Sequence, residues 1–120
     1  MNISLVMCGK RKRRGLHKAR NLYFSERFKK DFEEASKISE KVFILSAKHI
    51  LLKPESWVWN YDRELEGLPT EERALWAERV FRSITKISIP QDSIHFFADS
   101  EYYKELKELL DKAGHKTFVH

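Results

Sequence analysis

The sequence has little cysteine and no long apolar run. Its single cysteine, Cys8, excludes an internal disulfide bond and a zinc site built from several cysteines. No apolar segment approaches the roughly 20 residues that a membrane span needs. The apolar residues 3–7 precede a basic run, which is the reverse of the order in a signal peptide. We therefore expect a soluble protein of the cytoplasm.

The amino-acid composition suits one compact domain. The chain has 120 residues, of which 42% are apolar and 12% are aromatic, so it can build a hydrophobic core. It contains no internal repeat, linker or low-complexity segment. We expect residues 1–120 to form a single α/β domain.

Positive charge is concentrated near the N-terminus. Residues 1–30 contain ten Lys/Arg and one acidic residue, a formal charge of +9, whereas the other ninety residues carry −4. A cationic segment of this kind attracts phosphate groups, on a nucleotide or on a nucleic acid. The alternative interpretation is a solvated loop that has no ligand.

Apolar patterns predict alternating strands and helices. Short apolar runs predict strands over residues 2–8, 41–47, 93–98 and 115–119. Helical spacing of apolar side chains predicts helices over residues 26–39, 70–87 and 101–113. Residues 10–24 have the character of a loop. Residues 48–68 show no clear period, and a loop of this length is unusual in a small domain unless it is functional or contains a short element.

The order of these elements predicts a three-layer α/β/α sandwich. Strands that alternate with helices form a mainly parallel sheet with helices on both faces. With right-handed connections we expect four strands in the order 2-1-3-4, numbered along the chain. The gap between the first and third strands is then a topological switch point, where open α/β sheets bind their ligands.

Side chains suited to ligand binding follow the ends of these strands. They are Cys8, Gly9, Ser46, Lys48 and His49, with Tyr61 and Asp62 in the long loop. Because the carboxyl ends of parallel strands meet at one edge of the sheet, we expect these residues to lie close together. Cations that hold phosphate and rings that stack on a base suit a nucleotide ligand.

Several of these residues also have a plainer structural interpretation. Cys8 is either a small buried hydrophobic residue or a thiol activated by neighbouring cations. Ser46 can bond to the backbone at its strand end, and Asp99 can cap the third helix. Trp57 and Trp59 form either a lid or a small satellite of the core. No GxGxxG or Walker A motif is present, and we expect no cofactor and no metal.

Four short motifs occur in order along the chain. They are Cys8-Gly9-x-x-Lys12, Ala19-Arg20-x-Leu22-Tyr23, Ser46-Ala47-Lys48-His49 and Tyr61-Asp62. Together they resemble a family of small bacterial, archaeal and phage domains of unknown function, which is more remotely similar to the YaaA proteins and to uracil-DNA glycosylases. The resemblance extends over about residues 3–114. It implies a glycosylase-like three-layer fold and a nucleotide, a modified base or a nucleic acid as ligand.

The same resemblance implies a set of site residues. Matched by position, they are Cys8, Lys12, Arg20, Tyr23, Ser46, Lys48, His49, Tyr61 and Asp62. The sequence departs from the family at Ile50, where a glycine is usual, so we expect a different or less strained turn there. It also lacks the water-activating Asp after the first strand and the His-Pro-Ser loop of uracil-DNA glycosylases, so activity on uracil is not expected.

Three functional hypotheses follow. The first is an enzyme that cleaves or exchanges the N-glycosidic bond of a base, with Asp62 as the carboxylate and His49 as the proton donor. In that enzyme Lys12, Arg20 and Lys48 would hold phosphate, and either Tyr23 or Tyr61 would stack on the base. The second hypothesis is a non-catalytic basic module that binds nucleic acid. The third is a nucleotide-sensing domain within a larger assembly.

Overall fold

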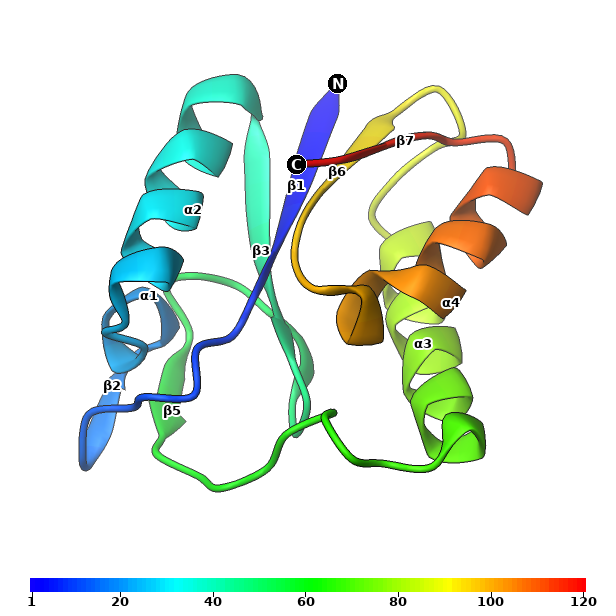
Figure 1. Ribbon diagram of the computed structural model, residues 1–120. Coiled ribbons are helices and arrows are strands. Elements are labelled where there is room, and N and C mark those ends of the chain that lie inside the picture. Colours follow the sequence, from blue (N-terminus) through cyan, green and yellow to red (C-terminus); the bar gives the residue numbers. More distant parts are fainter.

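A mixed, mainly parallel sheet of five strands forms the centre of the molecule. The computed structural model describes residues 1–120, and the sheet order is β4-β3-β1-β6-β7 (Figure 1). The strands are β1 (Asn2–Met7), β3 (Lys41–Ser46), β4 (Ile50–Leu52), β6 (Ser93–Phe97) and β7 (Lys116–Val119). All neighbours pair in parallel except β4, which is antiparallel to β3.

The prediction of a four-stranded sheet is wrong, because the chain folds back after β3 and adds β4 as a fifth strand at the edge. The four predicted strands, β3, β1, β6 and β7, keep their predicted relative order within the larger sheet. Residues 47–49 make the turn, and Ser46 Oγ accepts a hydrogen bond from the backbone N–H of His49 at 3.0 Å. Ile50 then adopts a φ of 69°, in the left-handed region that favours glycine. Of the two expectations for this position, a different turn or a less strained one, the second is wrong.

Three helices cover the two faces of the sheet. One face is covered by α2 (Glu26–Ile38), whereas α3 (Thr70–Thr85) and α4 (Ser100–Lys112) pack together on the other (Figure 1). The cap of α2 is Ser25, whose Oγ accepts a hydrogen bond from Phe28 N at 3.2 Å. The three predicted helices are therefore confirmed, with ends that differ by a few residues. None of the helices has both the length and the apolar character needed to cross a membrane.

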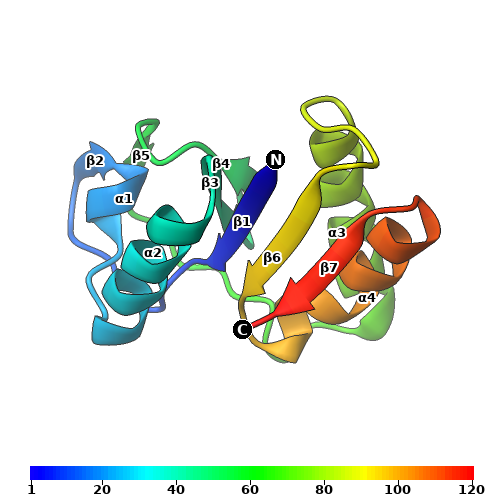
Figure 2. The ribbon, with the colours of Figure 1, turned by 90° about the horizontal axis from the view of Figure 1, so that it is seen from above.

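The two segments that were predicted as loops contain a second sheet. Strand β2 (Leu16–Lys18) pairs antiparallel with β5 (Trp57–Trp59), and a short helix, α1 (Ala19–Leu22), follows β2. The small sheet lies at the side of the molecule away from β7 (Figure 2). The prediction of a loop is wrong at residues 16–22, because cross-strand pairing with a distant segment forms β2 and a short helix follows it. In residues 48–68, β4 and β5 are short elements, which was one of the two alternatives for that segment.

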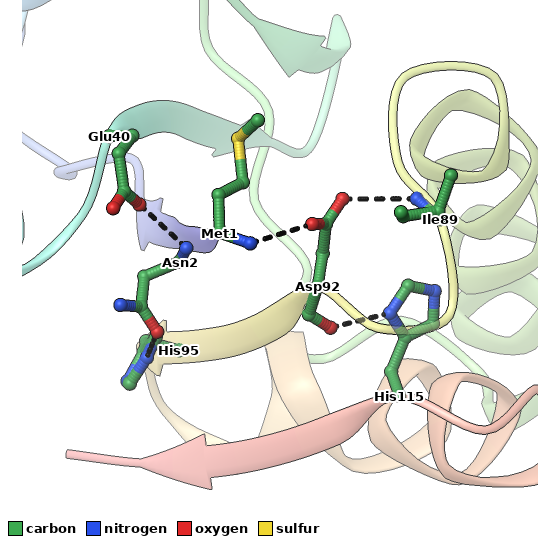
Figure 3. A network of polar contacts seen from close by, with 7 residues as sticks. All are labelled: Met1, Asn2, Glu40, Ile89, Asp92, His95 and His115. Carbon is green, nitrogen blue, oxygen red and sulfur yellow. Dashed lines mark hydrogen bonds and ion pairs between the residues drawn. The ribbon is translucent and has the colours of Figure 1, made fainter.

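A network of polar contacts lies at the amino-terminal end of the parallel strands (Figure 3). At its centre, Asp92 accepts hydrogen bonds from the amine of Met1 at 2.9 Å and from the backbone N–H of Ile89 at 3.0 Å. The bond from Ile89, and then the amine, hold the pKa of the Asp92 carboxyl below its usual range. Other pairs in this network join Asn2 N to Glu40, Asn2 Oδ1 to His95, and the Asp92 carbonyl to His115.

Candidate active site at the carboxyl edge of the sheet

The hydroxyl of Tyr61 joins two segments at the carboxyl edge of the sheet. It lies 2.6 Å from the hydroxyl of Tyr23 and 2.7 Å from Ser46 Oγ at the end of β3. Tyr23 and Ser46 are buried, and Tyr61 is half-buried. Burial raises the pKa of both tyrosines above the usual range, so their hydroxyls keep their protons. This chain of hydroxyls fixes the position of the Tyr61 ring.

Two cations and a histidine lie against that ring. The Nζ of Lys12 is 4.5 Å from the Tyr61 ring centroid, and the Nζ of Lys48 is 5.8 Å from it. The His49 ring meets Tyr61 edge-on at 5.2 Å between centroids. Partial burial, and then Lys48, lower the pKa of His49. Three predicted site residues from two separate motifs thus meet at one tyrosine, which belongs to a third motif.

A groove of about 620 Å³ opens beside Tyr61, between the turn after β3 and helix α3. Its charged lining residues are Lys48, Asp62, Arg63, Glu72 and Arg79. None of these five forms an ion pair or a side-chain hydrogen bond within the protein. Three cations and two carboxylates are therefore free to contact a ligand.

The wall of this groove is held by buried contacts. Trp76 is buried, donates its indole N–H to the backbone oxygen of Ser46 at 2.9 Å, and meets Tyr102 edge-on at 5.5 Å. Ile50, with its positive φ, also lines the groove. Backbone strain of this kind persists only where surrounding contacts enforce it, and it is common at functional sites.

A second cavity of about 350 Å³ includes the end of β1 and the start of α4, which follows β6, at the predicted switch point. It contains Cys8 and Gly9, and the Cys8 sulfur lies 3.4 Å from the Tyr102 hydroxyl in a buried setting. Its charged side chains are largely paired, because Lys10 contacts Glu66 at 2.5 Å and Arg27 contacts Asp99 at 2.8 Å. Asp99 makes no capping hydrogen bond to α4. This cavity therefore presents less free charge than the groove.

The predicted residues divide between these places. Lys48, Tyr61 and Asp62 line the groove, whereas the hydroxyls of Tyr23 and Ser46 and the side chains of Lys12 and His49 contact Tyr61. The two residues of the proposed catalytic pair lie in different places. Asp62 lines the groove, whereas His49 contacts Tyr61 and does not line the groove. Arg20 contacts Glu55 at 2.6 Å and lies 5.2 Å from the Phe32 ring centroid, so it takes no part in the Tyr61 cluster.

Five lining residues of the groove were not predicted from the sequence, namely Arg63, Glu72, Leu75, Trp76 and Arg79. The last four lie at positions i, i+3, i+4 and i+7 of α3, a spacing that places side chains on one face of a helix. The apolar stripe of α3 predicts only its buried side, whereas Glu72 and Arg79 lie on its polar side. No group of three or more His, Cys, Asp or Glu side chains lies where it could hold a metal ion.

The fold and the groove define an α/β protein with a ligand-sized, mixed-charge depression at the carboxyl edge of its sheet. The chain belongs to the family of unknown function DUF6884, whose family model matches residues 3–120. This confirms the expected membership in a family of unknown function. The comparisons show no link to the YaaA proteins or to uracil-DNA glycosylases. No curated protein and no solved structure matches the chain.

Proposed function

We propose that the protein binds a nucleotide unit, free or within a nucleic acid, in the groove beside Tyr61. The observation that carries the proposal is the set of unpaired charges around a fixed aromatic ring. Lys48, Arg63 and Arg79 provide cations that suit phosphate oxygens. The Tyr61 ring provides a flat apolar surface of the kind on which a base stacks.

The reaction that we propose at this site is cleavage of the N-glycosidic bond. Asp62 takes a proton from a water molecule, the water oxygen bonds to C1′ of the sugar, and the bond from C1′ to the base nitrogen breaks. The electron pair leaves with the base, which then accepts a proton. His49, which contacts Tyr61 but does not line the groove, is the proposed donor of that proton, through one bridging water molecule. Asp62 also stabilises the positive charge that develops on the sugar.

The lowered pKa of His49 makes this mechanism testable by pH. Only the protonated ring acts as a strong acid, and the protonated fraction increases as the pH falls through and below about 6.5, the ordinary value for histidine. We therefore expect kcat to increase between pH 7.5 and pH 6. The variant His49→Gln should lose that rise, and Asp62→Asn should lose turnover while keeping the affinity for nucleotide.

Binding is tested by calorimetric titration with a panel of nucleoside monophosphates and the matching nucleosides. We expect the monophosphates to bind more tightly than the nucleosides. Lys48→Ala and Arg79→Ala should each weaken binding of a monophosphate about tenfold, because each loses a charge-assisted contact. The control is Lys30→Ala, an exposed lysine of α2 on the other face of the sheet. Equal affinities in all three variants and the parent would refute the proposal.

A non-catalytic nucleic-acid-binding module is the second candidate function. It is supported by the segment of residues 1–30, in which only four of the ten cations are ion-paired, namely Lys10, Lys18, Arg20 and Arg27. For such a module, binding to a long oligonucleotide should weaken steeply with salt and should not depend on Asp62. Retained binding with no turnover on any nucleotide or nucleic acid would favour this candidate.

A further inference from the structure

Strand β5 presents two tryptophans to solvent. The side chains of Trp57 and Trp59 are 64% and 66% exposed, the highest values among the large apolar residues of the chain. Val58 between them is only 5% exposed, so the alternation of the strand directs both indoles outward. Two residues along a strand span about 6.6 Å, so the rings stand side by side. Exposed aromatic pairs of this kind mark interaction surfaces.

The tryptophans stand on a fixed support. Strand β5 is paired with β2, in the register Lys18 with Trp57 and Leu16 with Trp59. Beyond the end of this pairing, the backbone N–H of Asn60 donates to the Gly15 oxygen at 3.1 Å, and the Gly15 N–H donates to Asn60 Oδ1 at 3.0 Å. We call this unit, residues 16–18 and 57–59, the β2–β5 ribbon. The hydrogen bonds between its two strands hold the backbone that carries the two indoles in place, so flat ligands meet a surface that is already formed.

The surroundings of the ribbon are positively charged. Residues 10–20 contain seven Lys/Arg and no acidic residue. The nearest acid, Glu55, is shared by Lys18 at 3.1 Å and Arg20 at 2.6 Å, so its charge is more than balanced. The Nζ of Lys18 also lies 5.9 Å from the Trp57 ring centroid. This combination of exposed rings and excess cations complements a polymer that carries both bases and phosphates.

The ribbon is continuous with the groove described above. Tyr61 follows Trp59 by two residues, which limits the distance between their Cα atoms to about 7 Å. In the segment that precedes β2, the Nζ of Lys12 lies over the Tyr61 ring. A strand that stacks on the two indoles can therefore continue toward Tyr61.

We propose that the β2–β5 ribbon binds single-stranded nucleic acid, with successive bases stacked on Trp57 and Trp59 and phosphates facing the cations of residues 10–20. This inference rests on the proposed function, and it identifies the ligand of the protein as a nucleic acid rather than a free nucleotide. Base stacking is tolerant of sequence, because every base has a flat face. Paired bases inside a duplex are not available to stack on the indoles, so single strands should be preferred.

The test uses the full chain and three probes: a ten-nucleotide oligothymidylate, a ten-base-pair duplex and thymidine monophosphate. We expect the oligothymidylate to bind more tightly than either of the others and to quench tryptophan fluorescence. The double variant Trp57→Ala/Trp59→Ala should bind it at least about tenfold more weakly, with monophosphate binding unchanged. Trp57→Phe/Trp59→Phe should restore most of the affinity. Ile89→Ala, another exposed apolar residue, is the matched control.

The outcomes separate this inference from the proposed function. Oligothymidylate binding that is unchanged by the double alanine variant, or no tighter than that of the monophosphate or the duplex, would overturn the inference. The proposed function would still stand if Lys48→Ala weakened monophosphate binding. Conversely, loss of oligothymidylate binding in the tryptophan variants, with no effect of Lys48→Ala on either ligand, would support the ribbon and refute the groove.

Discussion

The polar network at the amino end of the parallel strands and the groove at their carboxyl end hold charged side chains in opposite states. At the amino end, Asp92 and Glu40 accept hydrogen bonds from the backbone or the N-terminal amine (Figure 3). At the carboxyl end, Lys48, Asp62 and Arg79 line a groove without an ion-pair partner. Paired groups stabilise the fold, whereas unpaired groups around a depression add little stability and remain available to a ligand. The comparison identifies which end holds the sheet together and which end is suited to bind.

The largest effect should come from a pair of aspartates, one at each end. Asp92→Ala leaves the Ile89 N–H without its acceptor and should lower the free energy of unfolding by about 1–3 kcal/mol. Asp62→Ala removes an exposed side chain that has no partner, so stability should change by less than about 0.5 kcal/mol. Urea denaturation of both variants measures the difference. Equal losses would show that the carboxyl end is also structural.

A smaller effect is expected from the Tyr61 hydroxyl, a part of the site that does stabilise the fold. Tyr61→Phe keeps the ring but leaves the buried Tyr23 hydroxyl without its partner, which should cost about 1–2 kcal/mol. Tyr103→Phe is the matched control, because the Tyr103 hydroxyl makes no hydrogen bond within the protein. If the two variants unfold at the same urea concentration, the hydroxyl chain does not fix the ring.

The smallest effect concerns pH and His95 at the amino end. Burial, and then His120, lower the pKa of His95, so the unfolded chain binds a proton at this residue more readily than the folded protein does. Stability should therefore fall as the pH drops through and below about 6.5, the ordinary value for histidine. Thermal unfolding at pH 7 and pH 5 should show a weaker pH dependence in His95→Gln than in the parent. The same dependence in both would exclude this contribution.

The sequence predicts the parts of the fold that follow from local apolar patterns. Strands β1, β3, β6 and β7 and helices α2, α3 and α4 each have such a pattern. Strands β2, β4 and β5 are three residues long and form only by pairing with partners that the local sequence does not specify. The outward Trp57 and Trp59 resemble loop residues when their partner strand is unknown.

The candidate site was predictable where it depends on strand ends. Because parallel strands share a carboxyl edge, Ser46 and Lys48 could be assigned to that edge, and Tyr61 and Asp62 to the loop beside it. The contribution of α3 was not predictable from its apolar stripe, since Glu72 and Arg79 face the groove from the polar side of the helix. The ion pair of Arg20 with Glu55 was not predictable, because Glu55 comes from a segment with no recognisable pattern.

The three tryptophans of the chain report on the two proposed surfaces separately. Trp76 lies in the groove wall, whereas Trp57 and Trp59 lie on the ribbon. The most direct measurement is therefore an NMR titration of the three indole N–H signals with a nucleoside monophosphate. We predict that the Trp76 signal shifts and saturates while the other two stay in place. An unmoved Trp76 signal at millimolar ligand would contradict nucleotide binding in the groove.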